Sequence, residues 1–159
     1  MQNGKPRAAI FDIDGVICAN QVLLHEFLQR EPTEDEWRDE WFAKIHEHPA
    51  HPGWVQLATM LFQGGFIVVL LTARPEYKRQ TTMEWLTLNE VDYHELVMRP
   101  DDCPYKDCKR LALASLQETY DVCLAIDDDD LQVKEFEAAG VPTIHADNGL
   151  RAHMAKDDD

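Results

Sequence analysis

Three pairs of polar residues in this chain each follow an apolar stretch typical of a buried strand. The pairs are Asp12 and Asp14, Thr72 and Arg74, and Asp127 and Asp128. If the stretches are parallel strands of one sheet, the pairs meet beyond its carboxyl edge, where ligands bind in open α/β sheets. Carboxylates that converge there repel one another unless a cation lies among them. The pattern therefore predicts a divalent cation, and Mg²⁺ is favoured because it leaves positions for water and a phosphate oxygen.

The same residue types could carry out phosphoryl transfer. One carboxylate can attack phosphorus and form an aspartyl-phosphate, while a second carboxylate carries a proton. The transferred group spreads negative charge over its equatorial oxygens, so the site also needs a hydroxyl donor and a fixed cation. Thr72 and a lysine of the segment "YKDCK", either Lys106 or Lys109, can supply these two groups.

The segments that must position these residues alternate between strand and helix patterns. Strands are predicted over residues 8–13, 66–71, 94–98, 122–126 and 142–146, and helices over residues 54–63, 76–89, 109–119 and from the "DDDD" run to Ala139. Such alternation predicts βαβ units. We therefore expect an α/β fold with a three-layer, Rossmann-like parallel sheet that helices cover on both faces.

A segment after the first strand interrupts this alternation with two short helical patterns, one of which begins with the capping-box spacing of Thr33 and Glu36. We expect this segment to form a small helical cap. The histidines at 46, 48 and 51 accompany prolines rather than a strong ligand motif, so we interpret them as ordinary loop residues. The predicted division is a catalytic core of residues 1–18 and 52–150, a cap of residues 19–51 and a disordered acidic tail of residues 151–159.

Composition excludes several partners. The net charge of −15, from 30 acidic and 15 basic residues, disfavours extended binding to duplex nucleic acid or to an anionic membrane. The longest fully apolar run, residues 66–71, is far shorter than the roughly 20 residues of a membrane span. The N-terminus lacks the apolar segment of a secretory signal, and the four cysteines form no dense disulfide framework. We expect a cytoplasmic protein with reduced thiols.

Four motifs occur in order, each at the end of an expected strand or near the start of an expected helix: "FDIDGVI", "LLTAR", a lysine at 106 or 109, and "AIDDDD". Together they resemble the motifs of the haloacid dehalogenase-like (HAD) phosphohydrolase superfamily, over the chain from Ala8 to about Ile144. More narrowly, "GGFIVVLLTARPE", "LVMRPDD" and "YDVCLAIDDDDLQVKEFEAAGV" resemble the 3′-phosphatase domain of bacteriophage polynucleotide kinase and its small relatives.

This resemblance implies a role for each matching residue. It makes Asp12 the nucleophile and a metal ligand, Asp14 the general acid/base with its backbone carbonyl on the metal, Thr72 the holder of the phosphoryl group, Arg74 a substrate contact, and Asp127 and Asp128 the remaining metal ligands. The polynucleotide kinase pattern places the lysine near Lys109, which we prefer, whereas the "YK" context of many members favours Lys106. Asp129 and Asp130 fit the acidic N-terminus of a helix.

The leading hypothesis is a magnesium-dependent phosphomonoester hydrolase that acts on a nucleotide or on the terminal 3′-phosphate of a nucleic acid. Its geometric condition is that Asp12 and Asp127 lie at the same end of the sheet. One alternative is a phospho-aspartate signalling module, because receiver domains also gather aspartates, a threonine and a lysine around Mg²⁺. A second alternative is a phosphate-binding relative without turnover.

Overall fold

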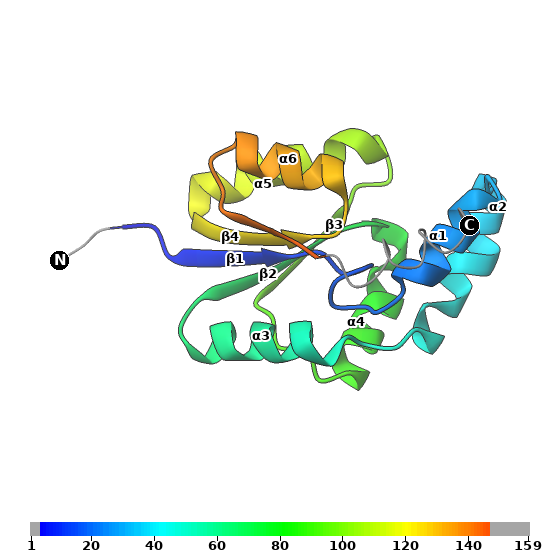
Figure 1. The fold of residues 1–159 in the computed structure, drawn as a ribbon, viewed down its shortest axis with the longest axis horizontal. Coiled ribbons are helices and arrows are strands. Elements are labelled where there is room, and N and C mark those ends of the chain that lie inside the picture. The colour runs from blue at the N-terminus through cyan, green and yellow to red at the C-terminus, as the bar shows by residue number, and fades with distance from the viewer. Residues whose placement is uncertain (1–3, 147–159) are drawn as a thin grey trace, which may run out of the picture.

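The five strands of the structure, a computed structural model that describes residues 4–146, form one parallel sheet in the order β3-β2-β1-β4-β5. The strands are β1 (Arg7–Phe11), β2 (Ile67–Pro75), β3 (Glu95–Arg99), β4 (Asp121–Asp127) and β5 (Thr143–His145). In the central strand, Ile10 pairs with Val69 of β2 and with Ala125 of β4. All carboxyl ends therefore lie along one edge of the sheet, toward which β1 points in Figure 1.

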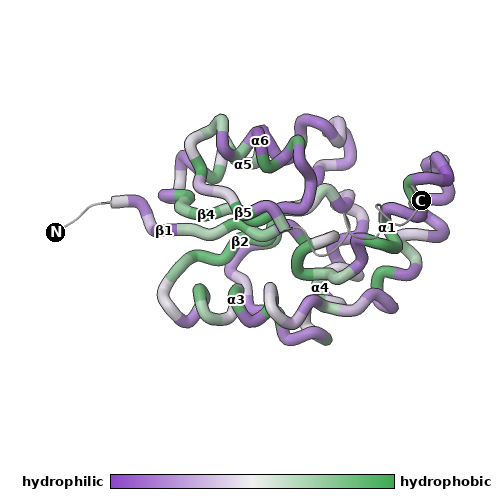
Figure 2. The backbone as a smooth tube through the Cα atoms, viewed as in Figure 1, coloured by the Kyte–Doolittle hydropathy of each residue, from purple (hydrophilic) through white to green (hydrophobic). Residues whose placement is uncertain are grey.

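Helices cover both faces of this sheet, as predicted (Figure 1). They are α3 (Pro52–Gln63) and α4 (Arg79–Leu88) on one face, and α5 (Tyr105–Thr119) and α6 (Asp130–Ala138) on the other. Alternate residues of β2 enter two separate hydrophobic clusters: Leu70 lies in one and Leu71 in the other, and neither is more than 2% exposed. Figure 2 shows the hydrophobic residues concentrated in the strands. A sheet buried on both faces explains the uninterrupted apolar run of β2.

Two differences from the sequence-based prediction concern residues of the predicted site. Strand β2 continues to Pro75, which pairs with Arg99 after a register shift, so Thr72 and Arg74 lie inside the strand rather than after it. Helix α5 begins at Tyr105 instead of Lys109. Its start follows Pro104, whose carbonyl oxygen accepts the first helical hydrogen bonds, and a proline is well tolerated at a helix start.

The segment between β1 and α3 lies beyond the carboxyl edge of the sheet (Figure 1). It consists of α1 (Gln21–Gln29), α2 (Glu34–Glu36), a π-helical turn η1 (Trp37–Trp41) and a 3₁₀ segment η2 (Phe42–Glu47). The predicted capping box is present, since Thr33 Oγ1 accepts from the Glu36 N–H and the Glu36 carboxylate accepts from the Thr33 N–H. Aromatic contacts bind the segment together, with the rings of Phe27 and Trp37 4.9 Å apart.

Two further expectations concern the chain as a whole. Within residues 4–146, no helix combines the length and the apolarity that a membrane span requires. Cys18, Cys103, Cys108 and Cys123 are free thiols in the structure. The predicted acidic tail, residues 151–159, lies outside the described residues.

The two-sided burial of the sheet can be tested at neighbouring positions. Leu70→Ala and Leu71→Ala should each lower the free energy of unfolding by about 2–5 kcal/mol, because each removes packing from a different buried face. Leu88→Ala, at a side chain that is 74% exposed, should change it by less than about 0.5 kcal/mol. Urea denaturation measures all three, and a neutral result at either strand position would contradict the three-layer arrangement.

Candidate active site at the carboxyl edge of the sheet

Three carboxylates meet at the carboxyl edge of β1 and β4. Asp12 follows β1, and its backbone N–H donates to the Ile126 carbonyl oxygen of β4 at 2.9 Å. One carboxylate oxygen from each of Asp12, Asp127 and Asp128 lies within 4.8 Å of the other two. Asp12 and Asp127 therefore lie at the same end of the sheet, which is the geometric condition of the leading hypothesis.

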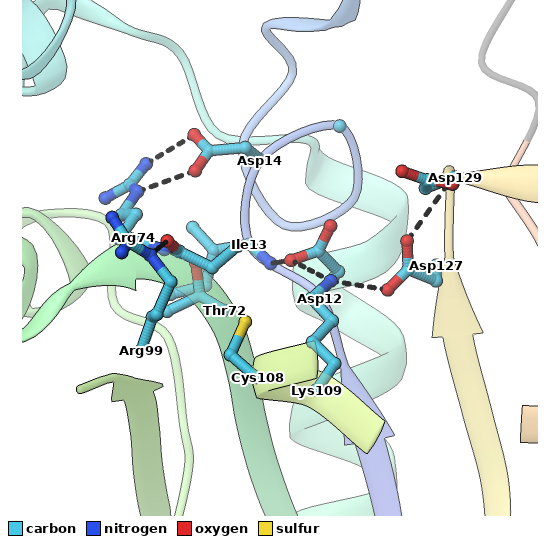
Figure 3. A network of polar contacts seen from close by, with 12 residues as sticks. Asp12, Ile13, Asp14, Thr72, Arg74, Arg99, Cys108, Lys109, Asp127 and Asp129 are labelled. Carbon is cyan, nitrogen blue, oxygen red and sulfur yellow. Dashed lines mark hydrogen bonds and ion pairs between the residues drawn. The ribbon is translucent and has the colours of Figure 1, made fainter. Parts of the chain in front are cut away.

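A buried lysine completes this group (Figure 3). Lys109 Nζ lies 2.6 Å from Asp127 Oδ2 and 3.0 Å from Asp12 Oδ1. Burial acts to lower the pKa of Lys109, but Asp12 and Asp127 outweigh it and raise the pKa above its ordinary value, so the ammonium group stays charged. Lys106 is exposed on the first turn of α5, and it forms no ion pair with the described carboxylates. The structure thus brings Lys109, and not Lys106, to the site.

The pKa values of two carboxylates in this group are raised, as is typical of acidic residues that share a cation site. Burial raises the pKa of Asp12 well above its usual value; Lys109 opposes this shift, and Asp127 and Asp128 add to it. Burial and the neighbouring Asp127 raise the pKa of Asp128 to about 7. A divalent cation among the three oxygens would remove this repulsion. Because carboxylate oxygens are the protein ligands that Mg²⁺ prefers, the donor set fits that ion.

Asp14 points away from the carboxylate group and toward Arg74 (Figure 3). Arg74 Nε donates to Asp14 Oδ2 at 2.8 Å and Arg74 Nη2 to Oδ1 at 2.7 Å, while Asn20 Nδ2 donates to Oδ1 at 2.8 Å. Burial acts to raise the pKa of Asp14, but the charge and hydrogen bonds of Arg74, with the bond from Asn20, hold it below its usual value. The Asp14 carboxylate is therefore ionised and lies outside the candidate metal group, which leaves only its backbone carbonyl for the metal.

The remaining predicted residues of β2 are buried at the same edge. Arg74 is 2% exposed and Thr72 1% exposed. Thr72 Oγ1 accepts from the backbone N–H of Arg74 at 3.1 Å, which leaves its own hydroxyl proton available to a ligand. Arg74 also lies over the ring of Trp85, with its guanidinium carbon 5.8 Å from the centroid. The guanidinium group is thus held in place from α4 as well as from Asp14.

The turn after β1 requires a glycine. Gly15 has a φ of +84°, and a Cβ built on it would lie 2.1 Å from Asp128 Oδ2. Its N–H donates to Asn20 Oδ1 at 2.9 Å, and its carbonyl oxygen accepts from Gln21 Nε2 at 3.0 Å. The turn therefore passes directly against one of the candidate metal ligands, and the first residues of the insertion hold it there.

Sequence reasoning missed Asn20 and His48. Asn20 stands before α1, where asparagine normally caps the helix, yet it makes no such cap and turns its side chain to Asp14 and Gly15 instead. His48 lies 3.2 Å from Asn20, measured from Nδ1 to Nδ2, and is buried. The two nearby histidines lie outside this network. His51 accepts a hydrogen bond from the Trp54 N–H at the start of α3, and His46 is exposed. Of these two residues, only Asn20, which immediately precedes α1, has a sequence position that could have drawn attention to it.

Comparisons with known proteins agree with this fold. The family described as HAD superfamily, subfamily IIIB (acid phosphatase), matches residues 1–150, whereas no curated protein matches the sequence. A chain of the Pnkp1/Rnl/Hen1 RNA repair complex is similar at a TM-score of 0.70 and 22% identity, over 89% of this chain and 42% of that one. The class C acid phosphatase from Bacillus anthracis with tungstate bound is similar at a TM-score of 0.64 and 18% identity, over 91% of this chain and 67% of that one.

A haloacid dehalogenase-like hydrolase from Streptococcus pneumoniae is also similar, at a TM-score of 0.63 and 15% identity, over 91% of this chain and 85% of that one. At these identities the likeness concerns the fold. The chain spans less than half of the RNA repair chain that it matches.

The buried ion pairs of Lys109 predict unequal effects at the two candidate lysines. Lys109→Met should lower the free energy of unfolding in metal-free buffer at pH 7 by about 3–5 kcal/mol, because it leaves buried carboxylates without a counter-charge. Lys106→Met, at an exposed position of the same helix, should change it by less than about 0.5 kcal/mol. Urea denaturation compares the two variants, and equal losses would show that the pairing at Lys109 contributes nothing.

The contact between Gly15 and Asp128 has a matched control at Gly65, whose φ is +85° but where a Cβ meets nothing within 4 Å. Gly65→Ala should show only the conformational cost of a positive φ, about 1–2 kcal/mol. Gly15→Ala should also displace Asp128, so that added Mg²⁺ no longer raises Tm. Thermal unfolding with and without Mg²⁺ separates the two effects, and an Mg²⁺-induced rise in Tm that Gly15→Ala retains in full would refute the displacement of a ligand.

Proposed function

The chain belongs to subfamily IIIB of the HAD superfamily, and on this premise we propose that it is a magnesium-dependent phosphomonoester hydrolase that works through an aspartyl-phosphate on Asp12. The family is shown by the match over residues 1–150; the phosphatase activity, the metal, the residue roles and the substrate are the content of the proposal. The observation that carries it is the grouping of Asp12, Asp127 and Asp128 around the buried ammonium group of Lys109.

We infer the metal ligands from the types of the grouped side chains. Asp12, Asp127 and Asp128 would hold Mg²⁺, together with the backbone carbonyl of Asp14. When bound, the ion neutralises negative charge on the phosphoryl oxygens and so stabilises the transition state. Lys109 keeps the Asp12 carboxylate in place and adds a second positive charge beside the reacting group.

Asp12 carries the covalent step. One of its carboxylate oxygens forms a bond to phosphorus while the ester P–O bond breaks, and the leaving alkoxide takes up a proton. Water then attacks phosphorus, the bond to Asp12 breaks, and the products are inorganic phosphate and the free carboxylate. Thr72 and Lys109 hold the oxygens of the transferred group in both steps.

Asp14 is the proposed proton carrier. Three hydrogen bonds from Arg74 and Asn20 keep it ionised, and an ionised carboxylate can take a proton from the water of the second step. To protonate the leaving group in the first step, the same carboxylate must first give up its bonds to Arg74 and take up a proton from solvent. The proton that it later takes from the attacking water returns it to the acid form. The paired conformation therefore corresponds to the base form of Asp14.

The insertion of residues 19–51 is the proposed cap. It lies beyond the edge of the sheet that carries the carboxylates (Figure 1), where it can screen the reaction from water and select the substrate. The fold shared with a chain of an RNA repair complex supports a substrate related to nucleic acid, and the motifs that resemble the polynucleotide kinase 3′-phosphatase domain favour a terminal 3′-phosphate or a nucleotide. The net charge of −15 disfavours wrapping of a duplex, so contact with a terminal phosphate suits the surface better.

The covalent role of Asp12 predicts that its replacement lowers activity strongly without changing the fold. Asp12→Asn should lower kcat for p-nitrophenyl phosphate by about 1,000-fold or more, because the amide oxygen is a much weaker nucleophile. Its circular dichroism spectrum should remain that of the wild type. Asp121→Asn is the matched control, since Asp121 is exposed at the opposite end of β4 from Asp127, and it should keep wild-type activity.

Measurements of hydrolysis also test the role of the metal and the choice of substrate. A chelator should abolish hydrolysis and added Mg²⁺ should restore it, and 3′-phosphorylated oligonucleotides or nucleotides should be hydrolysed with a higher kcat/KM than sugar phosphates. Wild-type turnover by Asp12→Asn would overturn the mechanism, and turnover in excess chelator would overturn the role of the metal.

A further inference from the structure

The side-chain amide of Asn20 makes its hydrogen bonds inside the protein through both its oxygen and its nitrogen. Asn20 is 1% exposed. Its Oδ1 accepts from the Gly15 N–H at 2.9 Å, and its Nδ2 lies 2.8 Å from Asp14 Oδ1 and 3.2 Å from His48 Nδ1. A primary amide has two N–H donors and a carbonyl oxygen with two lone pairs, so these three partners occupy both donors and one of the two lone pairs.

The chemistry of the partners fixes which end of the amide is which. The backbone N–H of Gly15, whose nitrogen also lies 3.0 Å from the Cys18 carbonyl oxygen, can only donate, so the Asn20 atom that faces it must be the amide oxygen. Asp14 is ionised and paired with Arg74, so it can only accept and requires the amide nitrogen. The orientation of the Asn20 amide therefore follows from its surroundings and not from an arbitrary assignment of oxygen and nitrogen.

This orientation also fixes the tautomer of His48. The second N–H of Asn20 faces His48 Nδ1, so Nδ1 must be unprotonated in order to accept it. The ring proton is then on Nε2 and the imidazole is neutral. Burial lowers the pKa of His48, which agrees with a neutral ring.

His48 is itself held from two neighbouring elements. Its ring centroid lies 4.8 Å from that of Trp41 in the insertion, and its backbone carbonyl oxygen accepts from Trp85 Nε1 of α4 at 2.9 Å. The imidazole is thus a fixed acceptor, and it can fix the group that donates to it.

We propose that His48 and Asn20 are positioning residues for the phosphatase reaction: neutral His48 holds the Asn20 amide, and this amide sets the orientation of Asp14 and of the Gly15 turn. This inference rests on the proposed function. Because Gly15 lies against Asp128, one amide touches the proton carrier on one side and the turn beside a candidate metal ligand on the other. A shift of the amide therefore disturbs both parts of the site.

The same histidine connects the site to the insertion. His48 and Trp41 line a cavity of about 410 Å³, together with Phe27, Arg30 and other residues of the insertion. His48 thus belongs to the wall of this cavity and also to the hydrogen-bond chain that ends on Asp14. Any rearrangement of the insertion that moves the imidazole reaches the proton carrier through two hydrogen bonds.

Steady-state kinetics with p-nitrophenyl phosphate tests the proposal. Asn20→Ala and His48→Leu should each lower kcat by about 10- to 100-fold, with KM changed by less than about threefold. His48→Asn should recover most of the lost kcat, because the asparagine Oδ1 can accept near the position of Nδ1. His46→Leu, at an exposed histidine two residues away, is the control and should behave as the wild type.

Nuclear magnetic resonance of the histidine ring nitrogens supplies a readout that does not depend on turnover. His48 should show the Nε2–H tautomer in the wild type and in the inactive Asp12→Asn variant, and it should lose this fixed tautomer in Asn20→Ala. A proton on Nδ1 of His48 in the wild type would overturn the proposal. So would His48→Leu with wild-type kcat, or His48→Asn with no recovery. An inactive wild-type protein would instead overturn the proposed function, and that outcome is distinct from all three.

Discussion

Mutual repulsion among three closely spaced carboxylates, two of them buried, is the constraint on which the rest of the structure depends. Asp12, Asp127 and Asp128 come from two neighbouring strands, and only the parallel order of the sheet brings their oxygens within 4.8 Å of one another. A fold selected for stability alone would not gather these groups, because each loses hydration on burial and raises the pKa of the others. Lys109 offsets part of the repulsion. The negative charge that is left on the carboxylates makes the site suitable for a divalent cation.

Two aspartates that are neighbours on the chain meet opposite electrostatic conditions. Burial and like charges raise the pKa of Asp12, whereas Arg74 and Asn20 hold the pKa of Asp14 down. Such a separation of environments is typical of sites in which two carboxylates have different tasks. The two side chains extend to different sides of the loop after β1: Asp12 lies near Asp127 at the end of β4, and Asp14 pairs with Arg74 of β2.

The sequence was sufficient to predict the layers, the strand order along the chain and the acidic residues at the strand ends, since apolar runs and their polar ends are local patterns. It left Lys106 and Lys109 as alternatives, because the start of α5 at Tyr105 depends on Pro104 and both lysines lie in the first turns of the helix. It missed Asn20 and His48 because local rules assign a cap to the first and a loop to the second. The contact of Asn20 with Asp14 and that of His48 with Asn20 exist only once β1, the insertion and α4 are packed together.

The π-helical turn at Trp37–Trp41 has a consequence for how this region can evolve in length. A π turn accommodates one more residue than an α turn while the helix continues. Loss of that residue would rotate everything that follows by about 100°, and the buried Phe42 and Ile45 would no longer face inward. Insertions and deletions should therefore be tolerated in the loop around Glu31 and rejected between Trp37 and Trp41, so that relatives of this protein keep the spacing of these two tryptophans while the preceding loop varies.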